Sequence, residues 1–201
     1  MHHAAVFYHR ALALLWGAWA LYWLISAVGT KRTLRRESLV KRLGYVLPLL
    51  IAAVLIGARG APWAAWLSMR LWPHSPVPPR IGLDLVLAGL AFSVWARVHL
   101  GRNWSGIVTV KEQHELIRTG PYALVRHPIY TGIITAALGT AVVSATVRAA
   151  IGVLIIAAAL VVKLRVEERF MRETFADQYA RYCEEVPALV PFTKFRRSAP
   201  R

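Results

Sequence analysis

The sequence predicts an all-α integral membrane protein with about five transmembrane helices, a cytoplasmic C-terminal helix and a tail that folds back on the helices. The chain has 201 residues, and at 57% hydrophobic it is more apolar than an ordinary soluble domain of this size. Its hydrophobic residues form long runs rather than the periodic stripes of amphipathic helices. Cys183 is the only cysteine, which excludes an intramolecular disulfide and a thiolate metal cluster, so no metal site is expected.

The apolar runs define the expected membrane spans, because a hydrocarbon core of about 30 Å needs about 20 apolar residues in a helix. Five segments approach that length: Tyr8–Val28, Leu43–Ala58, Ile81–Leu100, Ile129–Val147 and Ala149–Val162. The first is long and rich in tryptophan, unlike a secretory signal peptide, so it is expected to be a retained helix. The second contains Pro48, which can kink a helix. The fifth is short and is expected to continue as a helix beyond the bilayer.

The connections between these runs have their own patterns. The stretch 59–80, with three tryptophans followed by four prolines, predicts a short interfacial helix. Small residues on both sides of Ser144 to Arg148 permit a tight hairpin between the fourth and fifth spans. Such a hairpin returns the chain to the leaflet where it started, so polar residues at the start of one span and the end of the other should meet.

The C-terminal part of the chain predicts a further helix and a returning tail. Residues Met171 to Glu185 have helical composition and alternating charge, and Phe175, Tyr179 and Tyr182 are spaced to form one aromatic face. Prolines at 187 and 191 then turn the tail back toward the membrane. A single domain over residues 1–201 is sufficient, with the residues of chemical interest between 97 and 192.

Charge gives the expected orientation. The net charge is +15, with 25 basic and 10 acidic residues, and most basic residues fall in alternate connections and after the last span. The positive-inside rule places these connections and the C-terminus in the cytoplasm and the N-terminus outside, across the plasma (inner) membrane. Topology and attraction to anionic membrane lipids explain the basicity without a nucleic-acid partner.

Two polar clusters stand at the expected cytoplasmic face. The first is the stretch 120–132, in which Pro128 suits the first turn of a helix and holds Arg126 and His127 at its N-terminus. The second lies beyond the fifth span, where Glu167 and Glu168 are close to the bilayer and need partners. In isolation an Arg-His pair more often anchors head groups and caps a helix, and a charged helix extension is more often solvated. The convergence of the two clusters favours a site.

Taken in order, these residues resemble the isoprenylcysteine carboxyl methyltransferase family, which includes bacterial members and is related to the phospholipid methyltransferases. The resemblance covers residues 97–192 and rests on a fixed order of residues: His114, Leu116, Gly120, Pro121, Tyr122, Arg126, His127, Pro128, Tyr130, Gly132, Glu167, Glu168, Phe175 and Tyr179. One departure is Ala176, where many relatives carry glycine.

The resemblance implies an S-adenosyl-L-methionine-dependent methyltransferase whose cytoplasmic pocket is formed by the loop before the fourth span, the end of the fifth and the tail. The cofactor-binding residues carried over are His114, Leu116, Gly120, Tyr122, His127, Tyr130 and Glu168. The acceptor would be lipidic or amphiphilic, and isoprenylcysteine-type carboxyl O-methylation is the principal expectation. A carboxylate acceptor needs no base but needs a cation, for which Arg126, Arg165 and Arg169 are candidates. An ammonium acceptor would need a base such as Glu167 or His127.

Three alternatives stay open. One is a phospholipid or small-molecule N- or S-methyltransferase. A second is a nicotinamide-dependent sterol-type reductase, which has a similar Arg-His-Pro region but commonly places asparagine where this chain has Ile129 and an acidic residue where it has Ile133. A third is a small transporter, for which polar residues would be expected through several spans rather than at one face. The oligomeric state is open.

Overall fold

The computed structural model describes residues 2–28, 33–36, 38–57, 62–73, 75–101, 104, 109–111 and 116–193. Its elements are α1 (His2–Ser26), β1 (Thr33–Arg36), α2 (Leu39–Gly57), η1 (Pro62–Ser68), α3 (Val77–Leu100), β2 (Thr109–Lys111), η3 (Gly120–Ala123), α4 (Pro128–Ser144) and α5 (Val147–Glu185). Each expected span corresponds to one α-helix of the described residues, although the ends differ: Val28 lies beyond α1, and Val147 belongs to α5. The helices α2, α3 and α5 are long and apolar enough to cross a membrane, and α4 is a shorter apolar helix. Among the described residues α1 does not reach the same hydropathy, so a count of five spans stays a prediction.

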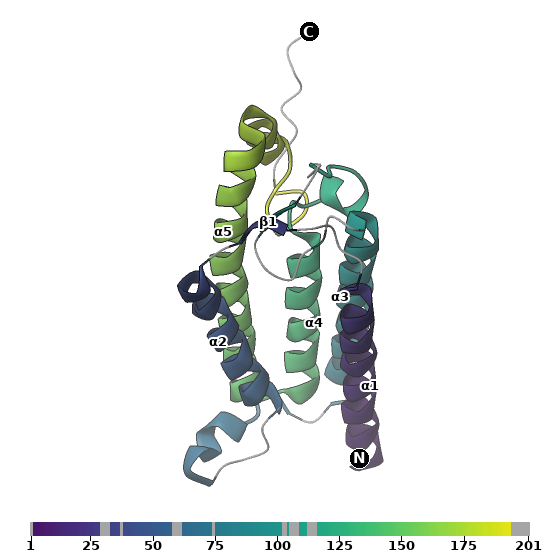
Figure 1. The fold of residues 1–201 in the computed structure, drawn as a ribbon. Helices are drawn as coiled ribbons and strands as arrows, with labels where there is room; N and C mark the ends of the chain where they lie inside the picture. Colours follow the sequence, from purple (N-terminus) through teal and green to yellow (C-terminus); the bar gives the residue numbers. More distant parts are fainter. Residues whose placement is uncertain are drawn as a thin grey trace.

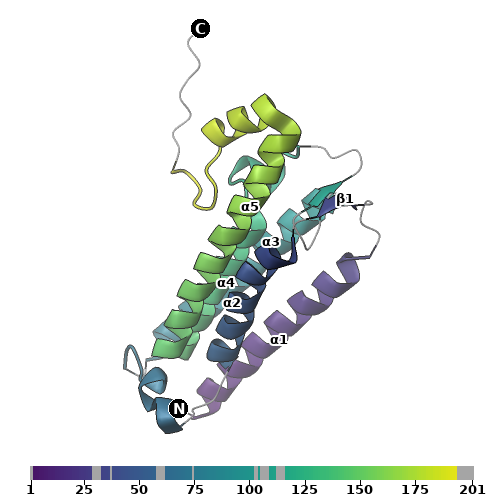
Figure 2. The same cartoon turned by 60° about the vertical axis from the view of Figure 1, so that its left-hand side comes forward.

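The five α-helices lie side by side along a common direction (Figures 1 and 2). The most extensive contacts join α3 to α4 and α2 to α5, while α1 packs against α3. The short strands β1 and β2 pair as an antiparallel ribbon at the end of the bundle where α5 emerges. The fold is therefore the predicted helical bundle of an integral membrane protein, with a small ribbon that the hydropathy pattern did not indicate.

The close contact of α3 and α4 depends on two pairs of glycines. A Cβ at Gly89 would lie 2.5 Å from the carbonyl oxygen of Gly132, and a Cβ at Gly82 would lie 2.7 Å from that of Gly139. Both pairs are seven residues apart on their helices, so they recur on one face about every two turns. Small residues allow helix backbones in a membrane to approach closely, and here they fix the register of α3 against α4.

Tryptophans of α1 attach that helix to the bundle through hydrogen bonds. Trp16 Nε1 donates to Thr140 Oγ1 at 3.0 Å, and Trp19 Nε1 donates to the buried Ser93 Oγ at 2.8 Å. The opposite side of α1 exposes large apolar residues such as Leu24, which is 73% exposed. This division is typical of a helix that packs on protein with one face and on lipid with the other.

The hairpin between α4 and α5 is as tight as predicted. Ala145 takes a left-handed conformation (φ 54°, ψ 31°) between the helices, and Val147 begins α5 two residues later. Ala145 O accepts from the amide of Leu71, which joins the hairpin to the segment after η1. The helix η1 is the short helix expected in the stretch 59–80, although it is a 3₁₀-helix, and its Trp66 is exposed.

The helix α5 extends beyond its apolar part, as predicted, but it is interrupted at Ala176. There the backbone has φ 41° and ψ −116°, outside the helical region. The chain turns at this point, and the last turns of α5 bend over the end of the bundle (Figure 2). Ala176 is thus the position of a bend that helical periodicity could not reveal.

Candidate functional site

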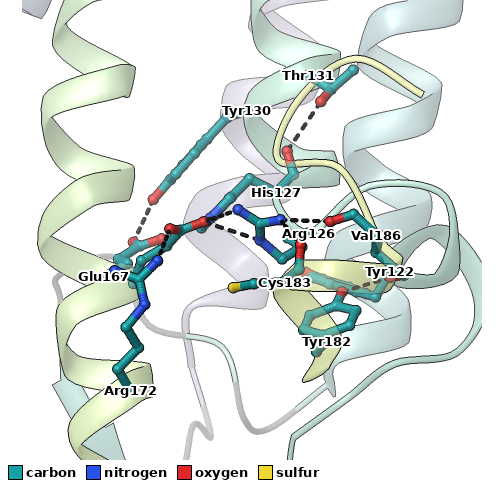
Figure 3. Close-up of polar contacts among 11 residues, drawn as sticks. Tyr122, Arg126, His127, Tyr130, Thr131, Glu167, Arg172, Tyr182, Cys183 and Val186 are labelled. Carbon is teal, nitrogen blue, oxygen red and sulfur yellow. Dashed lines mark hydrogen bonds and ion pairs between the residues drawn. The ribbon is translucent and has the colours of Figure 1, made fainter. Parts of the chain in front are cut away.

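The two predicted polar clusters meet at one end of the bundle, where α4 begins and α5 leaves its apolar part (Figure 3). Arg126 donates from Nε and Nη2 to Glu168 Oε1, at 3.0 and 2.6 Å. The two side chains are only 8% and 10% exposed. Breaking such a buried pair by removing one partner leaves an uncompensated charge, which typically costs about 3–5 kcal/mol.

The remaining donors of Arg126 hold the chain after α5. Its Nη1 donates to the carbonyl oxygens of Cys183 and Val186, at 3.3 and 2.5 Å. Burial lowers the pKa of Arg126, but its hydrogen bond and attraction to Glu168 outweigh burial and raise it overall. All three nitrogens of the Arg126 guanidinium therefore donate hydrogen bonds, and the side chain joins α5 to the tail.

His127 lies between two carboxylates. Its Nδ1 is 3.5 Å from Glu167 Oε2, and its Nε2 is 3.3 Å from Glu168 Oε1. Only the protonated ring can donate to both oxygens, since a neutral imidazole has one N–H. Burial lowers the pKa of His127, but the hydrogen bonds to Glu167 and Glu168 raise it above its ordinary value. The geometry thus favours a buried imidazolium.

Tyrosine rings lie beside His127 and Glu167 on the side of the helices. The Tyr130 hydroxyl donates to Glu167 Oε1, and its ring stacks on His127 with centroids 5.5 Å apart. Lys163, one turn before Glu167 on α5, lies over the rings of Tyr45 and Tyr130, at 5.3 and 5.4 Å from their centroids. A carboxylate beside aromatic rings is a suitable binding site for a cationic group.

The tail after α5 closes the site by pairing with the segment that precedes α4. The amides of Arg126 and His127 donate to Pro187 O and Ala188 O, at 2.9 and 3.0 Å. Thr131 Oγ1 donates to Leu189 O at 2.7 Å. The predicted return of the tail is therefore observed, and backbone hydrogen bonds fix it.

The turn at Gly120 forms the neighbouring wall. Gly120 has φ 59°, and a Cβ there would lie 2.8 Å from the His99 ring. His99 stacks on the buried Tyr122, with centroids 6.4 Å apart, and shares a 2.8 Å hydrogen bond with Thr119 Oγ1. Tyr182 donates to Tyr122 O at 2.6 Å. Both the space and the backbone conformation at position 120 therefore suit glycine.

The structure brings together five of the predicted residues in one cluster: Arg126, His127, Tyr130, Glu167 and Glu168. Gly120 and Tyr122 lie beside it, and Leu116 packs against the buried Tyr179 and Tyr182. His114 lies outside the described residues. Arg165 and Arg169 are exposed on α5, and no contact within the described part of the chain joins them to the cluster.

A periodic pattern explains which charges of α5 point inward. The buried series Leu160, Leu164 and Glu168 advances by four residues, so Glu168 continues the apolar face of the helix. Arg165 and Arg169 each follow this series by one residue, which turns them away from α4. Sequence reasoning also missed His99, Lys163 and Tyr45. Of these three residues, only Lys163 could have been recognised in the sequence, because it is a cation one helical turn before Glu167.

The fold and this buried ionic centre define a helical integral membrane protein with a polar site at one end of its bundle. The sequence profile described as the isoprenylcysteine carboxyl methyltransferase (ICMT) family matches residues 81–173. Over these residues the chain is similar to the isoprenylcysteine carboxyl methyltransferase family.

Similar proteins agree with this assignment. Protein-S-isoprenylcysteine O-methyltransferase B of Arabidopsis thaliana is 28% identical over 55% of this chain and 58% of its own length. Cobalt-zinc-cadmium resistance protein CzcN of Cupriavidus metallidurans is 29% identical over 60% of this chain and 53% of its own. The chain thus spans little more than half the length of these relatives.

A solved structure supports the fold. The eukaryotic intramembrane Ras methyltransferase ICMT aligns with a TM-score of 0.50 and 24% identity, over 76% of this chain and 51% of that one. At this identity the likeness concerns the arrangement of the helices. The site residues of the present chain are therefore argued from its own geometry.

Proposed function

We propose that this protein is an S-adenosyl-L-methionine-dependent methyltransferase that acts on a lipidic or amphiphilic acceptor at the inner leaflet of the plasma membrane. The observation that carries the proposal is the buried cluster of Arg126, His127, Glu167 and Glu168, assembled from the start of α4 and the end of α5. The match of residues 81–173 to the isoprenylcysteine carboxyl methyltransferase family supports it. Isoprenylcysteine-type carboxyl O-methylation is the activity we propose.

The residues present fit the cofactor. Carboxylates beside aromatic rings suit its sulfonium and its amino group, and Tyr122, Tyr130 and Leu116 offer aromatic and apolar walls for adenine. The residues that would hold it are Gly120, Tyr122, His127, Tyr130 and Glu168, with Leu116 before them and, as the resemblance implies, His114. Bound S-adenosyl-L-methionine would supply an electrophilic methyl group.

The chain's own residues would then act by enclosure and alignment. The tail residues 187–189 are fixed on the segment before α4, which excludes water from one side of the site. The Arg126–Glu168 pair keeps the carboxylates of α5 in position, and alignment of donor and acceptor can supply much of the rate acceleration of a displacement.

The state of His127 favours a carboxylate acceptor over an ammonium acceptor. An ammonium group must lose a proton before methylation, and a histidine held as an imidazolium between two carboxylates is a poor base. Glu167 already accepts the Tyr130 hydroxyl and faces His127. A carboxylate acceptor is nucleophilic at neutral pH and needs no such base.

Transfer of label from methyl-labelled cofactor tests the function. Arg126→Ala and Glu168→Ala are expected to abolish labelling of membrane extracts, because each breaks the pair that holds the cluster and leaves its partner as an unpaired buried charge. Circular dichroism of each variant checks separately that the helices still form. Arg181→Ala, an exposed arginine on α5, is the matched control and should label normally. Undiminished labelling in both site variants would remove the assigned site.

Mass spectrometry identifies the acceptor class. Extracts of lipids, small thiols and acids from cells with and without the protein are compared for an added methyl group. A methyl ester on an amphiphilic acid supports carboxyl O-methylation. Methylation of an amine or thiol would instead support an N- or S-methyltransferase.

The proposed orientation places the N-terminus outside and the site and C-terminus in the cytoplasm. Because Cys183 is the only cysteine, a Cys183→Ser background allows single cysteines to be introduced at either end of the bundle. A membrane-impermeant thiol reagent added to intact cells should label a cysteine at Trp66 and not one at Arg181. The reverse pattern would invert the topology.

A further inference from the structure

The two oxygens of the Glu168 carboxylate have different surroundings. Oε1 accepts hydrogen bonds from Arg126 at 3.0 and 2.6 Å and lies 3.3 Å from His127 Nε2. Oε2 instead accepts from Arg172 Nη2 at 3.2 Å (Figure 3). Buried groups therefore hold the carboxylate through one oxygen, while the other oxygen meets a cation that is accessible to solvent.

Arg172 lies where the buried cluster meets the solvent. Its side chain is 60% exposed, whereas that of Glu168 is 10% exposed. The two residues are one turn apart on α5, a spacing that usually gives a weak, solvated surface pair. Here the partner of the arginine is buried and belongs to the candidate site, so the guanidinium is held at the border of that site.

The Arg172 guanidinium has more donors than Glu168 uses. An arginine carries five N–H donors in a planar fork, and among the described residues Arg172 makes one hydrogen bond, to Glu168 Oε2. Such a fork binds a carboxylate through two parallel, charge-assisted hydrogen bonds. Arg172 can therefore receive the carboxylate of a ligand and remain beside Glu168.

The other cations of the described cluster are less suited to an anionic group that arrives from solvent. All three guanidinium nitrogens of Arg126 donate within the protein, and His127 lies between two carboxylates. Lys163 lies over the Tyr130 ring, toward the apolar part of α5. Arg172 is thus the cation of this cluster that stands on its solvent side.

The amino-acid end of S-adenosyl-L-methionine is a zwitterion, with an ammonium group and a carboxylate on the same carbon atom. An acidic and a basic side chain in contact match it, because each charge of the ligand meets its opposite. We propose that Arg172 binds the carboxylate of the cofactor and that Glu168 Oε2 binds its ammonium group, an inference that rests on the proposed methyltransferase function. The amino-acid end would then lie at the solvent border of the site, which suits a cofactor that enters from the cytoplasm.

Equilibrium binding to the full chain in phosphatidylcholine nanodiscs tests the proposal. The probes are S-adenosyl-L-methionine and its decarboxylated form, which keeps the ammonium and sulfonium groups but lacks the carboxylate. Wild-type protein is expected to bind the complete cofactor about tenfold more tightly, as a charge-assisted hydrogen bond allows. Arg172→Gln should remove this preference by weakening binding of the complete cofactor alone, and Arg172→Lys should retain part of it. Arg181→Gln, which removes another exposed arginine of α5, is the matched control and should keep the preference.

Three results would overturn the role of Arg172 alone. They are equal binding of both probes by the wild type, an unchanged preference in Arg172→Gln, and an equal loss of affinity for both probes in that variant. The last result would mean that Arg172 only holds Glu168 in place. Should Arg172→Gln fail to fold, the wild-type comparison and Arg172→Lys decide. If the wild type binds neither probe, the proposed function itself is overturned, and this inference with it.

Discussion

His127 illustrates how two neighbours set the charge of one buried side chain. Burial alone would favour the neutral ring, yet each ring nitrogen faces a carboxylate oxygen of α5. The imidazolium that results is held by Glu167 and Glu168, and it neutralises part of their charge. The residue is therefore expected to stabilise the fold as well as to line the site.

The stability contributed by His127 should depend on pH. Because the folded-state pKa is raised above the unfolded value, this stability is fully present below the unfolded pKa and is lost as the pH rises through the folded pKa. Thermal unfolding of wild type and His127→Gln should therefore differ most in mildly acidic solution and converge at alkaline pH. A difference that grows with pH would contradict the imidazolium assignment.

At the scale of single residues, the sequence predicted which side chains meet better than it predicted what each side chain does. The pairing of Arg126 with the carboxylates of α5 follows from hydropathy and the hairpin, because both segments must reach the same face. Arg165 and Arg169 were candidates for the site because a carboxylate acceptor needs a cation and both lie close after the fifth span. Only the contact between α4 and α5 shows that both point outward, although the series Leu160, Leu164 and Glu168 already indicates it.

At the scale of elements, the glycine pairs of α3 and α4 lead to a prediction about the free energy of unfolding. Gly89→Ala would place a Cβ 2.5 Å from Gly132 O and 2.6 Å from the amide nitrogen of Ala136, so the helices must separate. We expect a loss of about 1–3 kcal/mol in the free energy of unfolding, the usual cost of overpacking.

The control for this prediction is Gly44→Ala in α2, where no atom lies within 4 Å of the added Cβ. Alanine removes the backbone freedom of glycine in a helix, so the control should be neutral or should stabilise by up to about 1 kcal/mol. Unfolding in detergent, followed by circular dichroism, compares the two variants. Similar effects in both would mean that α3 and α4 are not in backbone contact.

The bend in α5 predicts a stabilising substitution. Ala176 has φ 41°, a conformation that costs a residue with a Cβ about 1–3 kcal/mol and that glycine adopts readily. Ala176→Gly should therefore raise the free energy of unfolding by about 1 kcal/mol. If α5 instead continued straight through this residue, the same substitution would destabilise it by a similar amount, and a melting temperature distinguishes the two outcomes.

The elements themselves were largely predictable, since long apolar runs demand helices in a bilayer. The bend at Ala176 was not, because helical periodicity is the same before and after it. The pairing of β1 with β2 was also not predictable, since it joins short polar segments from two separate loops. Contacts between distant segments determined both features.

At the scale of the whole molecule, the tail completes the site that the helices begin. Residues 186–189 accept hydrogen bonds from Arg126, His127 and Thr131. A variant that ends after Glu185 should therefore lose binding of S-adenosyl-L-methionine, because the Arg126 donors and the segment before α4 lose their acceptors. A variant that ends after Thr193 retains residues 186–189 and should bind normally. Calorimetric titration of both compares them, and normal binding by the shorter one would exclude the tail from the site.

The contacts of the tail also bear on the biosynthesis of the protein. The carbonyl groups of residues 186–188, which accept from Arg126 and His127, lie C-terminal to all five helices, so they leave the ribosome only after every helix has done so. Until then the guanidinium and the amides beside it depend on water or lipid head groups. The nascent helices would hence be in place before the proposed site is complete, and the site would form only when residues 186–189 emerge and pack against the start of α4.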